Sequence, residues 1–169
     1  MVCGSLELRG GDVGIAERVL REGAAVLEDA GEKGYRSTIL ALLGDALYMQ
    51  GRYEEAENVI VDSRAITAPE DVLNLGLIAS LQARLTAHRG AFAEADRAAR
   101  EGLRALERQP VYNLFTADVW MGLADAFHIV KRPEDARDAA RRALERYERK
   151  GVVSGVERAR AFLAALPSV

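Results

Sequence analysis

An alanine recurs in this chain about every forty residues, each time within a similar short segment. The segments 51–57, 90–96 and 131–137 are closely alike, and a weaker copy occupies 11–17. Their alanines are Ala16, Ala56, Ala95 and Ala136, at spacings of 40, 39 and 41 residues. A fixed period of this length is typical of repeat proteins, in which each unit packs against its neighbours. The repeat therefore predicts a stack of similar units, a type of fold that usually binds other molecules and rarely catalyses.

Apolar residues recur every three or four positions between glycines and prolines, as in amphipathic helices. The predicted core faces include Tyr35 at the start of one helix, Tyr53 in the next and Phe92 in a later one. Apolar residues make up 49% of the chain but aromatic residues only 6%, so the core must consist mainly of Ala, Leu and Val. Small and unbranched side chains suit closely packed helices better than strands. The fold class is therefore expected to be all-α.

Prolines and acidic residues indicate where several helices begin. Pro69, Pro110 and Pro133 are expected at the first position of a helix, where the missing N–H costs nothing. Glu70–Asp71 and Glu134–Asp135 are expected in the first turns that follow, where negative charge complements the helix dipole.

A second small residue lies twelve positions before each recurring alanine. The resulting pairs are Gly4 with Ala16, Gly44 with Ala56, Ala83 with Ala95, and Ala124 with Ala136. Two antiparallel helices joined by a tight turn need small side chains where they approach most closely. We therefore expect a single domain, 1–169: a right-handed α-solenoid of about four antiparallel helix pairs. The expected repeats span 1–31, 32–68, 69–109 and 110–150, and a C-terminal capping helix spans 152–166.

The second and fourth copies resemble the tetratricopeptide repeat. The matching residues are Leu40, Leu43, Gly44, Leu47, Ala56 and Ile60, and then Trp120, Leu123, Ala124, Phe127 and Ala136. The chain departs from that family in its period, which is near 40 where the family has 34. It also departs in the third copy, where Gln82 and Thr86 replace apolar residues, and in the first, where Glu7 does so.

A narrower resemblance is carried by the segments 27–35, 50–57, 147–151 and 159–163. They are similar to the long-repeat arms at the C-termini of bacterial adenylate-cyclase-associated ATPases and MalT/LuxR-type regulators. That resemblance implies a regulatory or scaffold arm in bacterial signalling or transcriptional regulation. It does not imply a catalytic unit.

The sequence offers no constellation that would support catalysis, a metal or a cofactor, so we expect none of them. His88 and His128 each lack a second ligand at helical spacing, and Cys3 has no neighbouring base. The glycine-rich segment 10–14 has no following lysine to bind phosphate. A lone cysteine and the absence of a secretory signal in residues 1–12 favour a cytoplasmic protein.

Nucleic acid and membranes are not expected partners. The formal net charge is −3, and the arginines between 137 and 150 are interleaved with acidic residues, as on a solvated helix face. The longest nearly apolar stretch, 73–81, is far too short to span a bilayer.

The expected binding surface is the concave face of the solenoid, lined by the first helix of each pair. Counting back from each recurring alanine places these residues on it: Asp45, Tyr48, Ser80, Arg84, His88, Met121, Asp125 and His128. Tetratricopeptide domains that clamp a terminal carboxylate have Lys, Asn and Arg on this face. Here Asp45, Arg84 and Asp125 alternate in charge, which favours a basic or mixed-charge partner. Alternatively, Arg84 simply bridges its two acidic neighbours.

The leading functional expectation is a protein or peptide partner bound in this groove, without catalysis. One alternative is a structural homodimerisation module, with a second copy of the chain covering the N-terminal end. Another is a small-molecule-sensing regulatory arm, which the resemblance to MalT implies.

Overall fold

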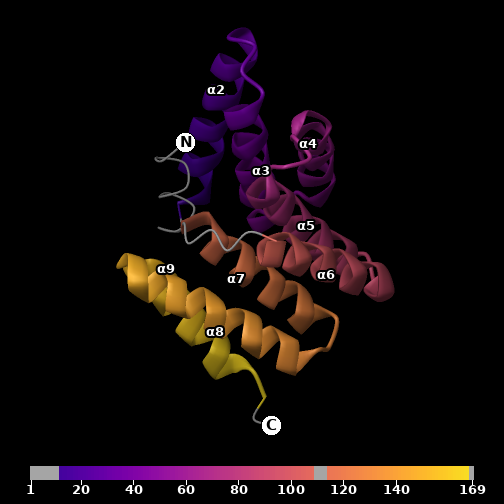
Figure 1. Cartoon of the computed structure of the whole chain (residues 1–169), viewed down its shortest axis with the longest axis vertical. Helices are drawn as coiled ribbons and strands as arrows, with labels where there is room; N and C mark the ends of the chain where they lie inside the picture. The colour runs from indigo at the N-terminus through magenta and orange to yellow at the C-terminus, as the bar shows by residue number, and fades with distance from the viewer. Residues whose placement is uncertain (1–11, 109–113, 168–169) are drawn as a thin grey trace.

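Every regular element that the structure describes is an α-helix, which confirms the expected all-α class. The computed structural model describes residues 12–108 and 114–167. Its eight helices there are α2 (Val13–Asp29), α3 (Gly34–Met49), α4 (Tyr53–Ile66), α5 (Val72–His88), α6 (Phe92–Arg108), α7 (Leu114–Ile129), α8 (Pro133–Lys150) and α9 (Val153–Ala165). They follow one another along the longest axis of the molecule, from α2 at one end to α8 and α9 at the other (Figure 1).

Consecutive helices pack as pairs. Helix α3 packs on α4, α5 on α6 and α7 on α8, and three residues link the members of each pair. Helices that are joined by so short a turn and pack along each other must run antiparallel. Between the pairs, α5 also contacts α3 and α7, while α2 lies on α3 and α9 on α8. No helix in the described residues is both long and apolar enough to cross a membrane.

The turns inside the pairs share one backbone conformation, which explains the recurring glycine of the repeat. Gly51 and Gly90 have φ angles of 75° and 78°, and the equivalent Lys131 has a φ of 63°. This left-handed region is costly for residues with a Cβ atom and costs glycine little. The glycines therefore favour the tight turn, and Lys131 adopts it because the flanking helices α7 and α8 hold it there.

The recurring alanines lie at the centre of the packed interior. Ala16, Ala56, Ala95 and Ala136 are all fully buried. Gly44 is so close to its neighbours that a Cβ atom on it would lie 2.7 Å from a methyl group of Leu81 and 3.7 Å from the Ala56 carbonyl oxygen. Ala83 and Ala124 are also fully buried. The small-residue pairs are thus interior positions, except that Gly4 and the helix expected around it lie outside the described residues.

Enlarging one of these alanines should destabilise the fold. We expect Ala56→Leu to lower the free energy of unfolding by about 1–3 kcal/mol, because a packed interior has no room for three more carbon atoms. Ala65→Leu on the same helix is a matched control at an exposed position, where we expect a change within about 0.5 kcal/mol. Urea unfolding followed by circular dichroism measures both. Equal stabilities of the two variants would contradict the assigned packing.

Three aromatic residues that the periodicity assigned to the core are exposed. Tyr35, Tyr53 and Phe92 are 62%, 38% and 49% exposed. Each occupies the first or second position of its helix. The periodicity indicates which side of a helix is apolar. It does not indicate whether the first turn of that helix extends beyond the neighbouring helix.

The expected helix starts are confirmed in one case and wrong in another. Pro133 occupies the first turn of α8, followed by Glu134 and Asp135, as predicted. Helix α5 begins later than Pro69, at Val72. Asp71 is its N-cap, and the Asp71 side chain accepts a 3.0 Å hydrogen bond from the backbone N–H of Asn74. Since the N-cap precedes the helix, Glu70 and Asp71 do not lie in its first turn. Pro110 lies outside the described residues.

Ion pairs join each helix pair to the next in a repeated manner. The residue after each of the first three recurring alanines is acidic, and it binds an arginine from the turn of the following pair: Glu17 with Arg52, Glu57 with Arg89, and Asp96 with Arg132. In the fourth copy this position is Arg137, whose guanidinium donates a 2.6 Å hydrogen bond to the Pro167 carbonyl oxygen. In the fourth copy a basic residue thus replaces the acidic one, and it binds the backbone just after the end of α9.

Glu17 should make stability dependent on acid. Hydrogen bonds from the amide of Gln50 and from Arg21 and Arg52 lower the pKa of Glu17 to about 2, against the opposing effect of burial. Since its pKa in the unfolded chain is about 4.5, this stabilisation is complete above that pH and disappears as the pH falls towards 2.

We therefore expect the stability difference between the wild type and Glu17→Gln to be constant near neutral pH. It should shrink between pH 4.5 and the lowest pH at which both proteins still fold. Urea titrations at several pH values measure this difference. In an Arg52→Gln background, which removes the hydrogen bonds from Arg52 to both carboxylate oxygens of Glu17, the same comparison should give a smaller pH dependence. A pH-independent difference would contradict the assignment.

Candidate functional site

Arg84 of α5 is the centre of a polar cluster built by the first helices of successive pairs. Its guanidinium forms an ion pair with Asp45 of α3 and lies 4.6 Å from the centre of the Tyr48 ring. Arg84 is only 4% exposed. Burial alone would lower the pKa of Arg84, but the Asp45 and Asp125 carboxylates raise it, so the side chain keeps its charge. The prediction that Asp45, Arg84 and Asp125 share one face is consistent with this arrangement.

The charges alternate across four helices. Asp45 of α3 forms an ion pair with Arg84 of α5, and Arg84 interacts electrostatically with Asp125 of α7. Beyond Asp125, a guanidinium nitrogen of Arg158 in α9 lies 3.7 Å from an Asp125 oxygen. Burial raises the pKa of Asp125, and Arg158 and Arg84 oppose that effect. The alternative interpretation of Arg84, a bridge between its acidic neighbours, therefore agrees with the structure better than a free ligand-binding cation does.

Tyr48, Tyr53 and His88 form an aromatic cluster next to Arg84. The Tyr48 hydroxyl and His88 Nε2 are 2.8 Å apart, and the His88 and Tyr53 rings are stacked with their centres 4.7 Å apart. Burial raises the pKa of Tyr48 to about 12, so its hydroxyl keeps its proton at neutral pH. Tyr53 and His88 are exposed, so this cluster, unlike Arg84, presents side chains to a partner. The periodicity assigned Tyr53 to the core, although the sequence also indicated that Tyr53 begins a helix directly after a tight turn.

Two predicted binding residues lie inside the protein. Ser80 and Met121 are each 1% exposed, so in this conformation they cannot contact a partner. The hydroxyl of Ser80 donates a hydrogen bond to the Leu77 carbonyl oxygen. Ser80 lies where α5 packs against α7, and Gly122 of α7 allows this approach: a Cβ atom there would lie 3.1 Å from Ser80 Oγ and 3.4 Å from Arg84 Nε. Counting residues along the repeat could not distinguish residues that line the groove from residues that are buried between helices.

Two side chains of α9 contact the other end of the predicted face. Arg158 reaches Asp125, and the Phe162 ring meets the His128 ring edge-on with the centres 5.8 Å apart. Arg158 and Phe162 were missed in the sequence because α9 was predicted only as a cap. Of the eight predicted residues, Tyr48 and His88 thus belong to the aromatic cluster and Asp45 lies next to it, whereas Asp125 and His128 contact side chains of α9.

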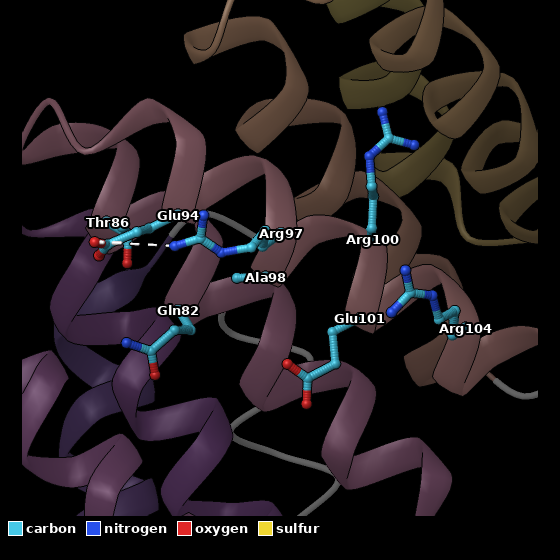
Figure 2. A pocket seen from close by; sticks show the side chains of 8 residues that line it. All are labelled: Gln82, Thr86, Glu94, Arg97, Ala98, Arg100, Glu101 and Arg104. Atoms are coloured by element: carbon cyan, nitrogen blue, oxygen red, sulfur yellow. Dashed lines mark ion pairs between the residues drawn. The ribbon is translucent and has the colours of Figure 1, made fainter.

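A separate hollow of about 550 Å³ lies on α5 and α6. Figure 2 shows the side chains that line it: Gln82, Thr86, Glu94, Arg97, Ala98, Arg100, Glu101 and Arg104. Gln82 and Thr86 are the polar residues by which the third copy departs from the tetratricopeptide pattern, and they lie at this water-accessible hollow. Arg97 pairs with Glu94 at 4.0 Å and Arg100 with Asp96 at 3.0 Å. None of the eight predicted residues lines the hollow, and its charges largely compensate one another.

Within residues 12–108 and 114–167, no group of three or more His, Cys, Asp or Glu side chains is placed to hold a metal ion. The polar cluster offers buried, compensated charges and exposed aromatic rings. Such a surface is suited to recognition.

The comparisons with known proteins concern the fold alone. No protein-family model and no curated protein sequence matches the chain. Among solved structures, BtubC (BKLC) from P. vanneervenii is similar, with a TM-score of 0.59 and 20% sequence identity. The match covers 89% of this chain and 62% of BtubC, so the chain spans less than two thirds of that protein's length.

Proposed function

We propose that this chain is a right-handed α-solenoid of the tetratricopeptide type and a non-catalytic module for binding a protein or peptide. The forty-residue period, the buried recurring alanines and the antiparallel packing of α3 on α4, α5 on α6 and α7 on α8 support the architecture. A regulatory or scaffold role in a bacterial cytoplasm fits the resemblance of the repeats to the arms of signalling ATPases.

The observation that carries the proposed function is the aromatic cluster of Tyr48, Tyr53 and His88, in which the Tyr53 and His88 rings are exposed. Aromatic residues are enriched at the centres of protein interfaces, because they bury a large area at little cost in conformational entropy. Arg84, which is buried and pairs with Asp45, lies against the Tyr48 ring, so the cluster is preorganised. A preorganised surface loses less entropy on binding. The alternating charges around it favour a basic or mixed-charge segment over an acidic one.

Quantitative affinity capture tests this function. The immobilised wild-type chain is compared with Tyr53→Ala and with Tyr35→Ala, a control that removes a more exposed tyrosine outside the cluster. We expect at least one protein to be retained by the wild type and by Tyr35→Ala and to be reduced more than tenfold by Tyr53→Ala. The purified partner should then show the same order of affinities. Identical sets of captured proteins for all three chains would refute a binding role for the cluster.

A further inference from the structure

Helix α9 contacts α7 through two side chains that lie one helical turn apart. Arg158 and Phe162 are four residues apart and therefore share one face of α9. They meet Asp125 and His128, which are three residues apart on α7. A basic residue thus faces an acidic one, and an aromatic ring faces the edge of another.

Helix α5 contacts α3 in the same way. Arg84 and His88 are four residues apart on α5, and they meet Asp45 and Tyr48, three residues apart on α3. Asp45 and Tyr48 occupy the same positions of the repeat as Asp125 and His128, eighty residues later. The structure therefore contains the same mode of recognition twice. In both cases one helix carries a basic residue that is followed four positions later by an aromatic residue. That helix lies on a second helix, which carries an Asp followed three positions later by an aromatic residue.

The two helices differ in how firmly the rest of the fold holds them. Helix α5 is buried along most of its length, between α3, α6 and α7. Within α9, only Gly155 and Ala159 are buried. The backbone at Gly155 lies directly against the Tyr147 ring of α8, and Arg158 is 41% exposed. The apolar residues Val156, Phe162 and Leu163 are only partly buried against the core, so α9 buries less apolar area than α5 and its displacement costs correspondingly less.

We propose that α9 is an internal occupant of the binding face at α7, and that the partner is an amphipathic helix that carries the same pair, a basic residue followed four positions later by an aromatic one. This inference deepens the proposed function and rests on it. The partner helix competes with α9 for Asp125 and His128. Displacement of α9 extends the accessible face from the aromatic cluster on α3, α4 and α5 to the end of α7.

The first test uses a fluorescent peptide of residues 152–167, which is α9 itself, and the full chain. Gly155→Val should release α9, because a Cβ atom at this position would lie 2.5 Å from the Tyr147 ring, whose hydroxyl donates a hydrogen bond to Asp118. We expect the peptide to bind Gly155→Val at least tenfold more tightly than the wild type, as measured by fluorescence anisotropy. Ala161→Val, at an exposed position of α9, is the matched control and should bind as weakly as the wild type.

Peptide variants test the recognition pair itself on the Gly155→Val chain. Phe162→Ala in the peptide should weaken binding at least tenfold and Arg158→Gln about fivefold. Arg160→Gln removes an arginine whose ion pair at the surface is with Glu148 of α8, so it should weaken binding less than twofold. Equal affinities of the Arg158→Gln, Phe162→Ala and unchanged peptides would overturn the proposal.

Further outcomes separate this inference from the proposed function. If Tyr53→Ala abolishes capture of a partner but the peptide binds the wild type and Gly155→Val equally, the proposed function stands and the displacement of α9 is refuted. A Gly155→Val chain that forms a dimer and binds no peptide would also refute it, because the occupant would be a second copy. If Gly155→Val fails to fold, as judged by circular dichroism, the double variant Arg158→Ala/Phe162→Ala replaces it, with the same expected and contradicting results.

Discussion

Asp45→Ala should lower the free energy of unfolding by about 3 kcal/mol, because it leaves the buried guanidinium of Arg84 without its ion-pair partner. Arg84 is 4% exposed, so water cannot replace the lost carboxylate, and Asp125 remains as a more distant counter-charge. For a chain of this length, the midpoint of thermal unfolding should fall by about 6–12 °C. Urea unfolding and differential scanning calorimetry measure the two quantities.

Removal of both charges is the control for this first prediction. Arg84→Met keeps most of the volume and the apolar contacts of the side chain, and the double variant Asp45→Ala/Arg84→Met leaves neither charge of the pair buried. We expect the double variant to be more stable than Asp45→Ala alone, because the cost arises from the unpaired charge. A loss below about 1 kcal/mol for Asp45→Ala would show that Arg84 is solvated or that Asp125 compensates it fully.

Tyr147→Ala should destabilise the chain by about 4 kcal/mol, the largest effect that we expect from removing a side chain at the C-terminal end. Tyr147 is fully buried in α8, its ring lies against Gly155 of α9, and its hydroxyl donates a 2.7 Å hydrogen bond to Asp118 of α7. The substitution leaves a cavity where α7, α8 and α9 meet. Hydrogen exchange in α9 should therefore accelerate more than exchange in α3.

Tyr147→Phe separates the ring from the hydroxyl group. It keeps the packing against Gly155 and removes only the hydrogen bond to Asp118, so we expect a loss of about 1 kcal/mol. If Tyr147→Phe cost as much as Tyr147→Ala, the polar contact would dominate, and α9 would not depend on the ring for its position.

The pattern of small residues predicted the interior with success because it reports a local requirement. Ala56 and Gly44 lie where two neighbouring helices approach each other, and only small side chains fit there whatever the rest of the fold does. The same pattern misplaced Tyr35, Tyr53 and Phe92. These residues lie at helix starts, where exposure depends on how far the next helix extends.

The candidate site was predicted only in part, for a similar reason. Counting along the repeat brought Asp45, Arg84 and Asp125 to one face, since residues at equivalent positions of a stacked repeat align. It did not separate Ser80 and Met121, which are buried, from Tyr48 and His88, which reach the surface. A rotation of a helix by a fraction of a turn decides between these environments, and that rotation is set by packing. Gly122 permits the contact between α5 and α7, and no sequence pattern distinguishes it from the other glycines.

The amino-acid sequence by itself determined the helical class, the forty-residue period and the small residues of the interior, because these follow from spacing along a helix and from side-chain size. Only the tertiary structure decided that Arg84 is buried between carboxylates, that Tyr53 joins Tyr48 and His88 at the surface, and that α9 lies on Asp125 and His128. These features depend on distances between helices that belong to different repeats. No local pattern records such distances, because they result from the packing of the whole stack.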